Sequence, residues 1–337
     1  MKQKQKGKCM EEKKFKINLH IVFAIAVVLI IAIIASKFIG FGRTISKDEI
    51  DAIPTPENPE ITVYDELFSN MVEDDGTFPE DDGVTTVVCF GNSPFSDDLD
   101  DKDNLCRLFA EETGATVYNC SVPGSFMSSF YDPFQNDYFP MDAFSFCRLA
   151  TAITENDYSM VDAALDMYEA VEYDTTDIQK SMEVLRSIDF NKVDAIIVMY
   201  DATDYLNGRK IQNTENFTDP TQFTGAMAMG VKMIQEKFPW IRIIIMSPTY
   251  AFGVDENGNY ISSDVKSYGP GYLSSYVILQ AQVAYELQVS FVDNLYGTIH
   301  EDIAADYLVD NVHLNLKGRQ RVVKRMKEAL EKYTTIY

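Results

Sequence analysis

Residues 85–93 read TTVVCFGNS, a pattern typical of a buried strand that stops at a glycine and presents a serine. Residues 85–90 are β-branched or apolar and carry no charge, which suits a strand covered on both faces. Gly91 permits a sharp exit that a residue with a Cβ would resist. Ser93 then comes just beyond the strand, where open α/β sheets place their ligands. The alternative role for a serine at this point is a helix cap.

Strand and helix patterns alternate along the rest of the chain. Further strands are predicted at 116–120, 195–200, 242–247 and 290–292, and helices at 102–113, 141–153, 160–171, 176–188, 221–238, 273–287 and 317–333. Five strands that alternate with helices indicate an α/β fold with a mostly parallel sheet and right-handed crossovers.

The N-terminal segment predicts a single membrane anchor. Residues 17–36 contain no Asp, Glu, Lys or Arg, and about 20 apolar residues span a bilayer. The preceding 16 residues hold seven lysines and two glutamates, so the N-terminus is expected inside the cell. A cleaved signal peptide is the alternative, but its apolar region is usually shorter, and Ala32 and Ala35 provide no clear cleavage site.

These patterns divide the chain into four parts. We expect a basic cytoplasmic tail at 1–16, a transmembrane anchor at 17–39, an acidic tether containing prolines at 40–83 and a globular domain at 84–337. Residues 61–71 within the tether could dock on the domain as a short amphipathic piece. The net charge of −23 makes nucleic acid an unexpected partner, because phosphate binding needs a basic face.

Cysteine and glycine patterns exclude several common sites. The five cysteines form no C-x-x-C pair, and there is no G-x-G-x-x-G or Walker loop, so neither a zinc site nor a nucleotide cofactor is expected. Four of the cysteines lie in the predicted extracytoplasmic part: Cys89, Cys106, Cys120 and Cys147. Disulfides are permitted there, while free buried thiols are the alternative.

Histidine is scarce, which narrows the search for a catalytic base. Outside the predicted span only His300 and His313 occur, so a histidine-rich metal centre is not expected. His313 follows Asp310 by three residues, a spacing that lets the carboxylate reach Nδ1 and leaves Nε2 free to take a proton from a serine. His300 adjoins Glu301 and Asp302, whose side chains diverge from it, and it is the weaker candidate.

Two turns at the same edge of the predicted sheet could stabilise an oxyanion. The turn at 119–125 contains Gly124, which allows close approach of its backbone to a ligand. The turn at 201–204 reads DATD, and its alternative role is that of an exposed turn in which Asp204 bonds its own backbone.

Four blocks now resemble the GDSL/SGNH hydrolase family in order and spacing: Gly91-Asn92-Ser93, 119–125, 201–204 and Asp310-x-x-His313. The resemblance covers residues 84 to about 333. It implies a flavodoxin-like three-layer α/β/α sandwich and a serine hydrolase acting on esters without a cofactor. By position Ser93 resembles the nucleophile, His313 the base and Asp310 its orienting acid. Gly124 and the Ser93 N–H resemble the oxyanion donors.

This chain departs from the family pattern at two blocks. Asn92 replaces the aspartate of the first block, a mild polar change. In the third block Asp201 and Thr203 stand where the family has glycine and asparagine. Thr203 can donate only through a shorter hydroxyl, and the Asp201 carboxylate would oppose developing negative charge unless it is turned away or neutralised. Loss of one oxyanion donor typically lowers the rate about 10²–10³-fold.

Three functions are compatible with these residues. The first is a membrane-anchored extracytoplasmic serine esterase or deacylase, with O-acylated cell-surface carbohydrate as its expected substrate. The second is an acyltransferase that uses Ser93 with a sugar hydroxyl as acceptor. The third is a binding module that keeps the fold without the activity. The acyl group, the oligomeric state and the effect of the altered third block do not follow from the sequence.

The anchor generates the first prediction. Protease added to intact cells that express the full-length protein should remove the domain at 84–337 and spare the N-terminal segment, because residues 1–16 hold the N-terminus inside. The products can be followed by immunoblotting with an epitope at each end. Protection of the domain until lysis would reverse the predicted topology.

Overall fold

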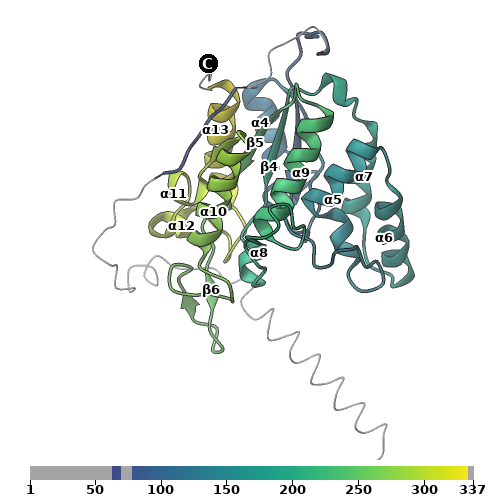
Figure 1. The fold of residues 1–337 in the computed structure, drawn as a ribbon. Helices are drawn as coiled ribbons and strands as arrows, with labels where there is room; N and C mark the ends of the chain where they lie inside the picture. Colours follow the sequence, from purple (N-terminus) through teal and green to yellow (C-terminus); the bar gives the residue numbers. More distant parts are fainter. Residues whose placement is uncertain (1–62, 70–77, 333–337) are drawn as a thin grey trace, which may run out of the picture. The chain divides into compact units, whose positions relative to one another are not determined.

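A parallel five-stranded sheet forms the centre of the structure, a computed structural model that describes residues 63–69 and 78–332 (Figure 1). Its strands are β2 (Thr86–Gly91), β3 (Thr116–Asn119), β4 (Ala195–Met199), β5 (Arg242–Met246) and β8 (Ser290–Val292), in the spatial order β3-β2-β4-β5-β8. This is the 2-1-3-4-5 order of flavodoxin-like folds. All five predicted strands and the α/β class are therefore confirmed.

Burial of the strands follows their position in the sheet. Every residue of β2 and β4 is buried, and their registers pair Gly91 with Met199 at the carboxyl ends. β3 lies at one edge and is half-buried or exposed throughout. The carboxyl ends of β2 and β4 therefore lie side by side at the centre of the sheet, which is where ligands bind in such folds.

Seven longer helices cover the sheet: α4 (Leu105–Thr113), α5 (Phe146–Glu155), α6 (Ser159–Ala170), α7 (Thr176–Ser187), α9 (Phe223–Lys237), α10 (Leu273–Glu286) and α13 (Leu316–Glu331). Helix α13 packs against α4, while α9 packs against both α5 and α10 (Figure 1). With right-handed crossovers this pairing places α4 and α13 on one face of the sheet, and α5, α9 and α10 on the opposite face. At the contact of α5 with α9, a Cβ on Gly230 would lie 2.6 Å from the Phe146 ring.

Local signals account for helix α4. The Asn104 side chain accepts a hydrogen bond from Cys106 N at 3.0 Å and caps the N-terminus. Gly114 ends the helix in the left-handed conformation, with φ of 73°, as the sequence predicts. The predicted start at residue 102 is three residues early.

The helix predicted at 141–153 is divided into the 3₁₀ helix η1 (Pro140–Phe144) and α5, which begins only at Phe146. Several other short elements carry no periodic signal and were not predicted. They are α3 (Ser93–Ser96), η2 (Phe190–Lys192), α8 (Thr203–Leu206), the hairpin of β6 (Gly253–Val254) with β7 (Tyr260–Ile261), α11 (Asn294–Gly297), η3 (Glu301–Ile303) and α12 (Ala304–Tyr307). Each is too short for a hydrophobic period to develop. Two of them, α3 and α8, lie at the candidate site.

Residues 63–69 of the predicted tether dock against the outer edge of β8. Glu66 and Phe291 exchange backbone hydrogen bonds of 3.0 and 2.7 Å, which makes an antiparallel bridge. Arg325 of α13 forms an ion pair with Asp65, and Phe68 N donates to Ser290 Oγ at 3.0 Å. The segment docks as the sequence suggested, in extended conformation, and it covers an edge that would otherwise be open to pairing with another chain.

The four cysteines that the structure describes are free thiols, and all of them are buried. Burial raises the pKa of Cys120, as it does for Cys106 and Cys147. Of the two alternatives left by the sequence, the structure shows buried thiols.

The predicted anchor at 17–39 lies outside the described residues, as does most of the predicted tether. Among the helices within residues 63–69 and 78–332, none is long and apolar enough to cross a bilayer.

Candidate active site

The turn after β2 places Ser93 at the start of a single helical turn. Asn92 takes the N-cap position of α3, and Pro94 supplies the fixed φ that suits a first helical turn. Gly91 is required by close approach, because a Cβ there would lie 1.9 Å from the Met199 carbonyl oxygen on β4. The chain can therefore pass from β2 into the turn that carries Ser93 only with a glycine at position 91.

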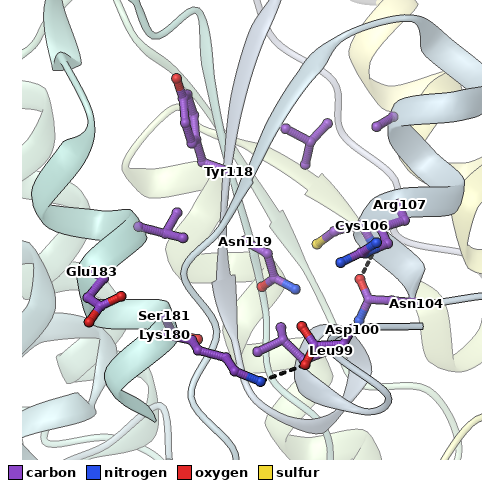
Figure 2. Close-up of a pocket in the computed structure, with 13 residues that line it drawn as sticks. Leu99, Asp100, Asn104, Cys106, Arg107, Tyr118, Asn119, Lys180, Ser181 and Glu183 are labelled. Atoms are coloured by element: carbon purple, nitrogen blue, oxygen red, sulfur yellow. Dashed lines mark hydrogen bonds and ion pairs between the residues drawn. The ribbon is translucent and has the colours of Figure 1, made fainter. Parts of the chain in front are cut away.

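Two amides anchor this turn from the direction of β3 and α4. The Nδ2 atoms of Asn104 and Asn119 both donate to the Phe95 carbonyl, at 2.6 and 2.8 Å, and Asn104 also donates to the Asp97 carbonyl at 3.0 Å. Both asparagines line a cavity of about 450 Å³ between α4, β3 and α7 (Figure 2). The backbone that carries Ser93 is thus held by side chains from two other elements.

Asp201, just after the end of β4, is hydrogen-bonded to both Asn92 and Ser93 of the turn after β2. The Ser93 hydroxyl donates to Asp201 Oδ2. Asn92 Nδ2 donates to Asp201 Oδ1 at 2.8 Å, and the Asp201 N–H donates back to Asn92 Oδ1, also at 2.8 Å. Thr203 N adds a further bond to Oδ1 at 2.9 Å. The Asp201 side chain is 4% exposed, so these donors replace the water that a carboxylate requires.

The two departures from the family pattern therefore belong together. An aspartate at position 92 would face the Asp201 carboxylate at hydrogen-bond distance, where two like charges disfavour each other. Asn92 instead presents an N–H to that carboxylate and an oxygen to the Asp201 amide. Considered alone, the change to Asn92 is mild and the change to Asp201 is unfavourable. Together the two residues form a buried pair whose hydrogen-bonding groups are satisfied.

Asp310 and His313 form the second part of the site, in the loop before α13. Asp310 Oδ2 lies 2.7 Å from His313 Nδ1, and Oδ1 accepts the N–H groups of Val312 and His313 at 2.9 and 2.8 Å. Burial raises the pKa of Asp310, but these hydrogen bonds outweigh it and hold the pKa below its usual range. The contact predicted from the D-x-x-H spacing is present.

Three carboxylates act on the His313 imidazole. The hydrogen bond from Asp310 raises the pKa of His313 to about 9, against the effect of burial, and the charges of Asp97 and Asp201 raise it further. A neutral imidazole is the form that can accept a proton. At pH 7 the resting site therefore holds a protonated His313.

Asp97 is a site residue that sequence reasoning missed. Its N–H donates to the Ser93 carbonyl at 3.0 Å. Burial raises the pKa of Asp97 to about 6, with the His313 charge lowering it and the Asp201 charge raising it. Its position one helical turn after Ser93 is the signal that could have identified it.

The groups predicted to donate hydrogen bonds to an oxyanion differ in whether they already have an acceptor in the structure. Within the described residues, neither the Ser93 N–H nor the Gly124 N–H has an acceptor. Gly124 is exposed and has a φ of 74°. The Thr203 N–H is already bonded to Asp201, so only its hydroxyl remains for the predicted role, and that role stays a prediction.

Two other residues singled out from the sequence, Asp204 and His300, make contacts with groups other than Ser93. Asp204 is buried and accepts hydrogen bonds from Met127 N, Ser128 N and Ser128 Oγ, at 2.9, 3.3 and 2.6 Å. It ties the turn after β4 to the loop after β3, and the alternative of an exposed Asx turn is wrong. His300 Nδ1 lies 3.6 Å from Asp302 Oδ2, so the expectation that the Asp302 side chain diverges from His300 is wrong. Over the described ranges, no group of three or more His, Cys, Asp or Glu side chains is placed to hold a metal ion.

Comparison with solved structures identifies the fold. One crystal structure matches with a TM-score of 0.50 at 18% identity, covering 75% of this chain and 98% of its own. A carbohydrate acetylesterase from Sinorhizobium meliloti has a TM-score of 0.42 at 12% identity, covering 73% and 98%. A protein from Bacteroides ovatus described as a GDSL-like lipase has a TM-score of 0.43 at 11% identity, covering 74% and 98%. No family model matches the sequence, and no curated protein does.

The coupling of His313 to Asp310 generates the second prediction. Titration of His313 followed by NMR of its imidazole Cε1–H should give a pKa near 9. In Asp310→Asn the pKa should fall toward the ordinary value of 6.5, because the strongest hydrogen bond to the imidazolium is weakened. Asp302→Asn removes the carboxylate beside His300 and should leave the His313 titration unchanged. A pKa near 6.5 in the unaltered protein would contradict this account.

Proposed function

We propose that the chain is a membrane-anchored serine ester hydrolase that acts outside the cytoplasm on O-acyl groups of carbohydrate. Ser93 is the nucleophile, His313 the general base and Asp310 the group that orients His313. The observation that carries the proposal is the position of Asp201, whose carboxylate binds the Ser93 hydroxyl and whose charge acts on His313. His313 is at the same time paired to Asp310.

The proposed reaction passes through an acyl-enzyme. Ser93 Oγ forms a bond to the acyl carbon while its proton moves to His313 Nε2. The ester alcohol then leaves with that proton, and water attacks the acyl group on Ser93 to release the acid. The N–H groups of Ser93 and Gly124, which have no acceptor in the described part of the chain, would donate to the oxyanion. Asp310 would stabilise the imidazolium formed in each step.

The resting arrangement must change before the first step. The Ser93 hydroxyl donates to Asp201 and has to turn toward His313. His313 also has to lose its proton: with a pKa of about 9, roughly one molecule in a hundred carries the neutral imidazole at pH 7. The value of kcat/KM should accordingly rise with pH up to about 9. Because the resting Ser93 and His313 are both unready for the first step, a non-catalytic binding module is the second candidate function.

The nucleophile assignment generates the third prediction. Ser93→Ala should abolish hydrolysis of p-nitrophenyl acetate by the full-length protein and should abolish labelling by a fluorophosphonate. Ser96→Ala is the matched control, because Ser96 lies on the same helical turn, is buried, and has an unpartnered Oγ within the described residues. Full turnover in folded Ser93→Ala protein would exclude Ser93 as nucleophile. Inertness of the unaltered protein toward both reagents would favour the binding module.

The Ser93–Asp201 hydrogen bond generates the fourth prediction. Asp201→Asn should raise kcat/KM at pH 7 by about tenfold. The new Nδ2 would donate to Ser93 Oγ and free its proton for His313, while loss of the charge lowers the His313 pKa. The pH profile of kcat/KM should move to lower pH together with the rate. If Asp201→Asn is instead as inactive as Ser93→Ala, Asp201 is the base and the assignment of His313 is wrong.

A further inference from the structure

A continuous row of aromatic rings follows the second block of the site. Its members are Phe126, Phe139, Phe130, Tyr131 and Tyr138, and we call it the aromatic shelf. Successive ring centroids are 6.2, 5.4, 4.9 and 6.2 Å apart. Phe130 is 53% exposed and Tyr138 is 74% exposed, so the row passes from the half-buried Phe126 to open surface.

The shelf begins beside the nucleophile turn. Asn92 Nδ2 donates to the Ser125 carbonyl at 3.0 Å, and Phe126 is the next residue. Met127 N is bonded to Asp204 in the turn after β4. The inner end of the row is therefore tied to the residues on both sides of Ser93, and the outer end is exposed to solvent.

The loop that carries the shelf is held in place by two residues of the domain, Arg209 and Asp142. The Arg209 guanidinium lies 4.3, 4.5 and 5.5 Å from the ring centres of Phe126, Phe130 and Phe139, and Arg209 is only 8% exposed. Asp142 accepts the N–H groups of Phe130 and Tyr131 at 2.5 and 2.8 Å. Cation–π contact with a buried guanidinium stabilises such a ring arrangement. Phe130 is thus fixed in position at the surface.

The chemistry around the shelf favours a neutral, polyhydroxylated ligand over a lipid surface. Residues 126–147 contain three aspartates and no Lys or Arg, and the next residue, Arg148, is paired with Asp132 at 2.9 Å. The chain as a whole has a net charge of −23. Attachment to a membrane uses basic side chains beside the apolar ones. A sugar ring has an apolar face that can stack on Phe130 or Tyr138 and hydroxyl groups that can bond the phenol and the half-exposed Asp132 carboxylate.

We propose that the aromatic shelf binds the sugar rings of the acylated carbohydrate and directs the ester toward Ser93. This inference rests on the proposed function, since it names the part of the substrate that lies beyond the reacting ester. Phe130 and Tyr138 contribute the stacking faces. Arg209 and Asp142 position Phe130, and Tyr138 packs on Tyr131, whose N–H Asp142 also binds. The shelf has no role toward a small aryl ester, which is too short to extend along it.

The test compares two substrates in the full-length protein. Phe130→Ala and Tyr138→Ala should each lower kcat/KM for partly acetylated xylo-oligosaccharide by about tenfold, the equivalent of one aromatic stacking contact. The loss should appear mainly in KM, and hydrolysis of p-nitrophenyl acetate should change less than twofold. Tyr173→Ala is the matched control, because Tyr173 is also 50% exposed and packs on Tyr168 with ring centroids 4.7 Å apart, outside the shelf. It should alter neither reaction.

The other outcomes either overturn the shelf as a sugar site or show that the proposed function fails while the shelf is tested separately. Equal losses on both substrates, or unchanged kinetics on both, would overturn the shelf as a sugar site. If the unaltered protein hydrolyses neither substrate, the proposed function fails, and calorimetric titration with deacetylated xylo-oligosaccharide decides the shelf. Binding that is lost in Tyr138→Ala supports the shelf, and absence of binding overturns it. Shelf-dependent binding to anionic phospholipid vesicles, without oligosaccharide binding, would also overturn it.

Discussion

The paired hydrogen bonds between Asn92 and Asp201 are the interaction on which the site depends. They join the carboxyl ends of β2 and β4, which are neighbours in the sheet. An unpaired carboxylate buried to this degree would cost several kcal/mol, and the amide and hydroxyl donors around Asp201 offset that cost. The same contacts fix the position of Ser93. Removing Asn92 would therefore disturb the nucleophile and the buried charge together.

Electrostatics sets the resting state of the site. Asp97, Asp201 and Asp310 all act on one imidazole, and they favour its charged form. The arrangement holds Ser93 with a carboxylate and His313 with a proton, which is the opposite of what the first chemical step requires. Under the proposed mechanism, a substrate would have to displace the serine hydroxyl from Asp201, and His313 would have to lose its proton. A low basal rate at neutral pH is therefore expected of the proposed hydrolase.

The sequence predicts the sheet well because its strands are uninterrupted apolar runs. β2 and β4 show this most clearly, and the D-x-x-H spacing likewise predicts the contact between Asp310 and His313. The sequence could not show which group accepts the hydrogen bond of the Ser93 hydroxyl, because the answer depends on the direction of side chains that follow two different strands. Asp97 was missed because α3, the four-residue helix that places it one turn after Ser93, is too short to be recognised from sequence. The pairing of Asn92 with Asp201 was missed because 109 residues separate them.

The bridge between Glu66 and Phe291 has a consequence for the order of folding. The neighbouring bond from Phe68 to Ser290 spans 222 residues of sequence, so it can form only after the intervening chain has collapsed. Contacts of such long range contribute most to contact order and form slowly. The segment is held by hydrogen bonds, one ion pair and the buried Phe68 ring, whose centroid lies 6.2 Å from that of Tyr285. Because it meets β8 through a single bridge at the sheet edge, residues 63–69 should exchange their amide hydrogens before the central strands do.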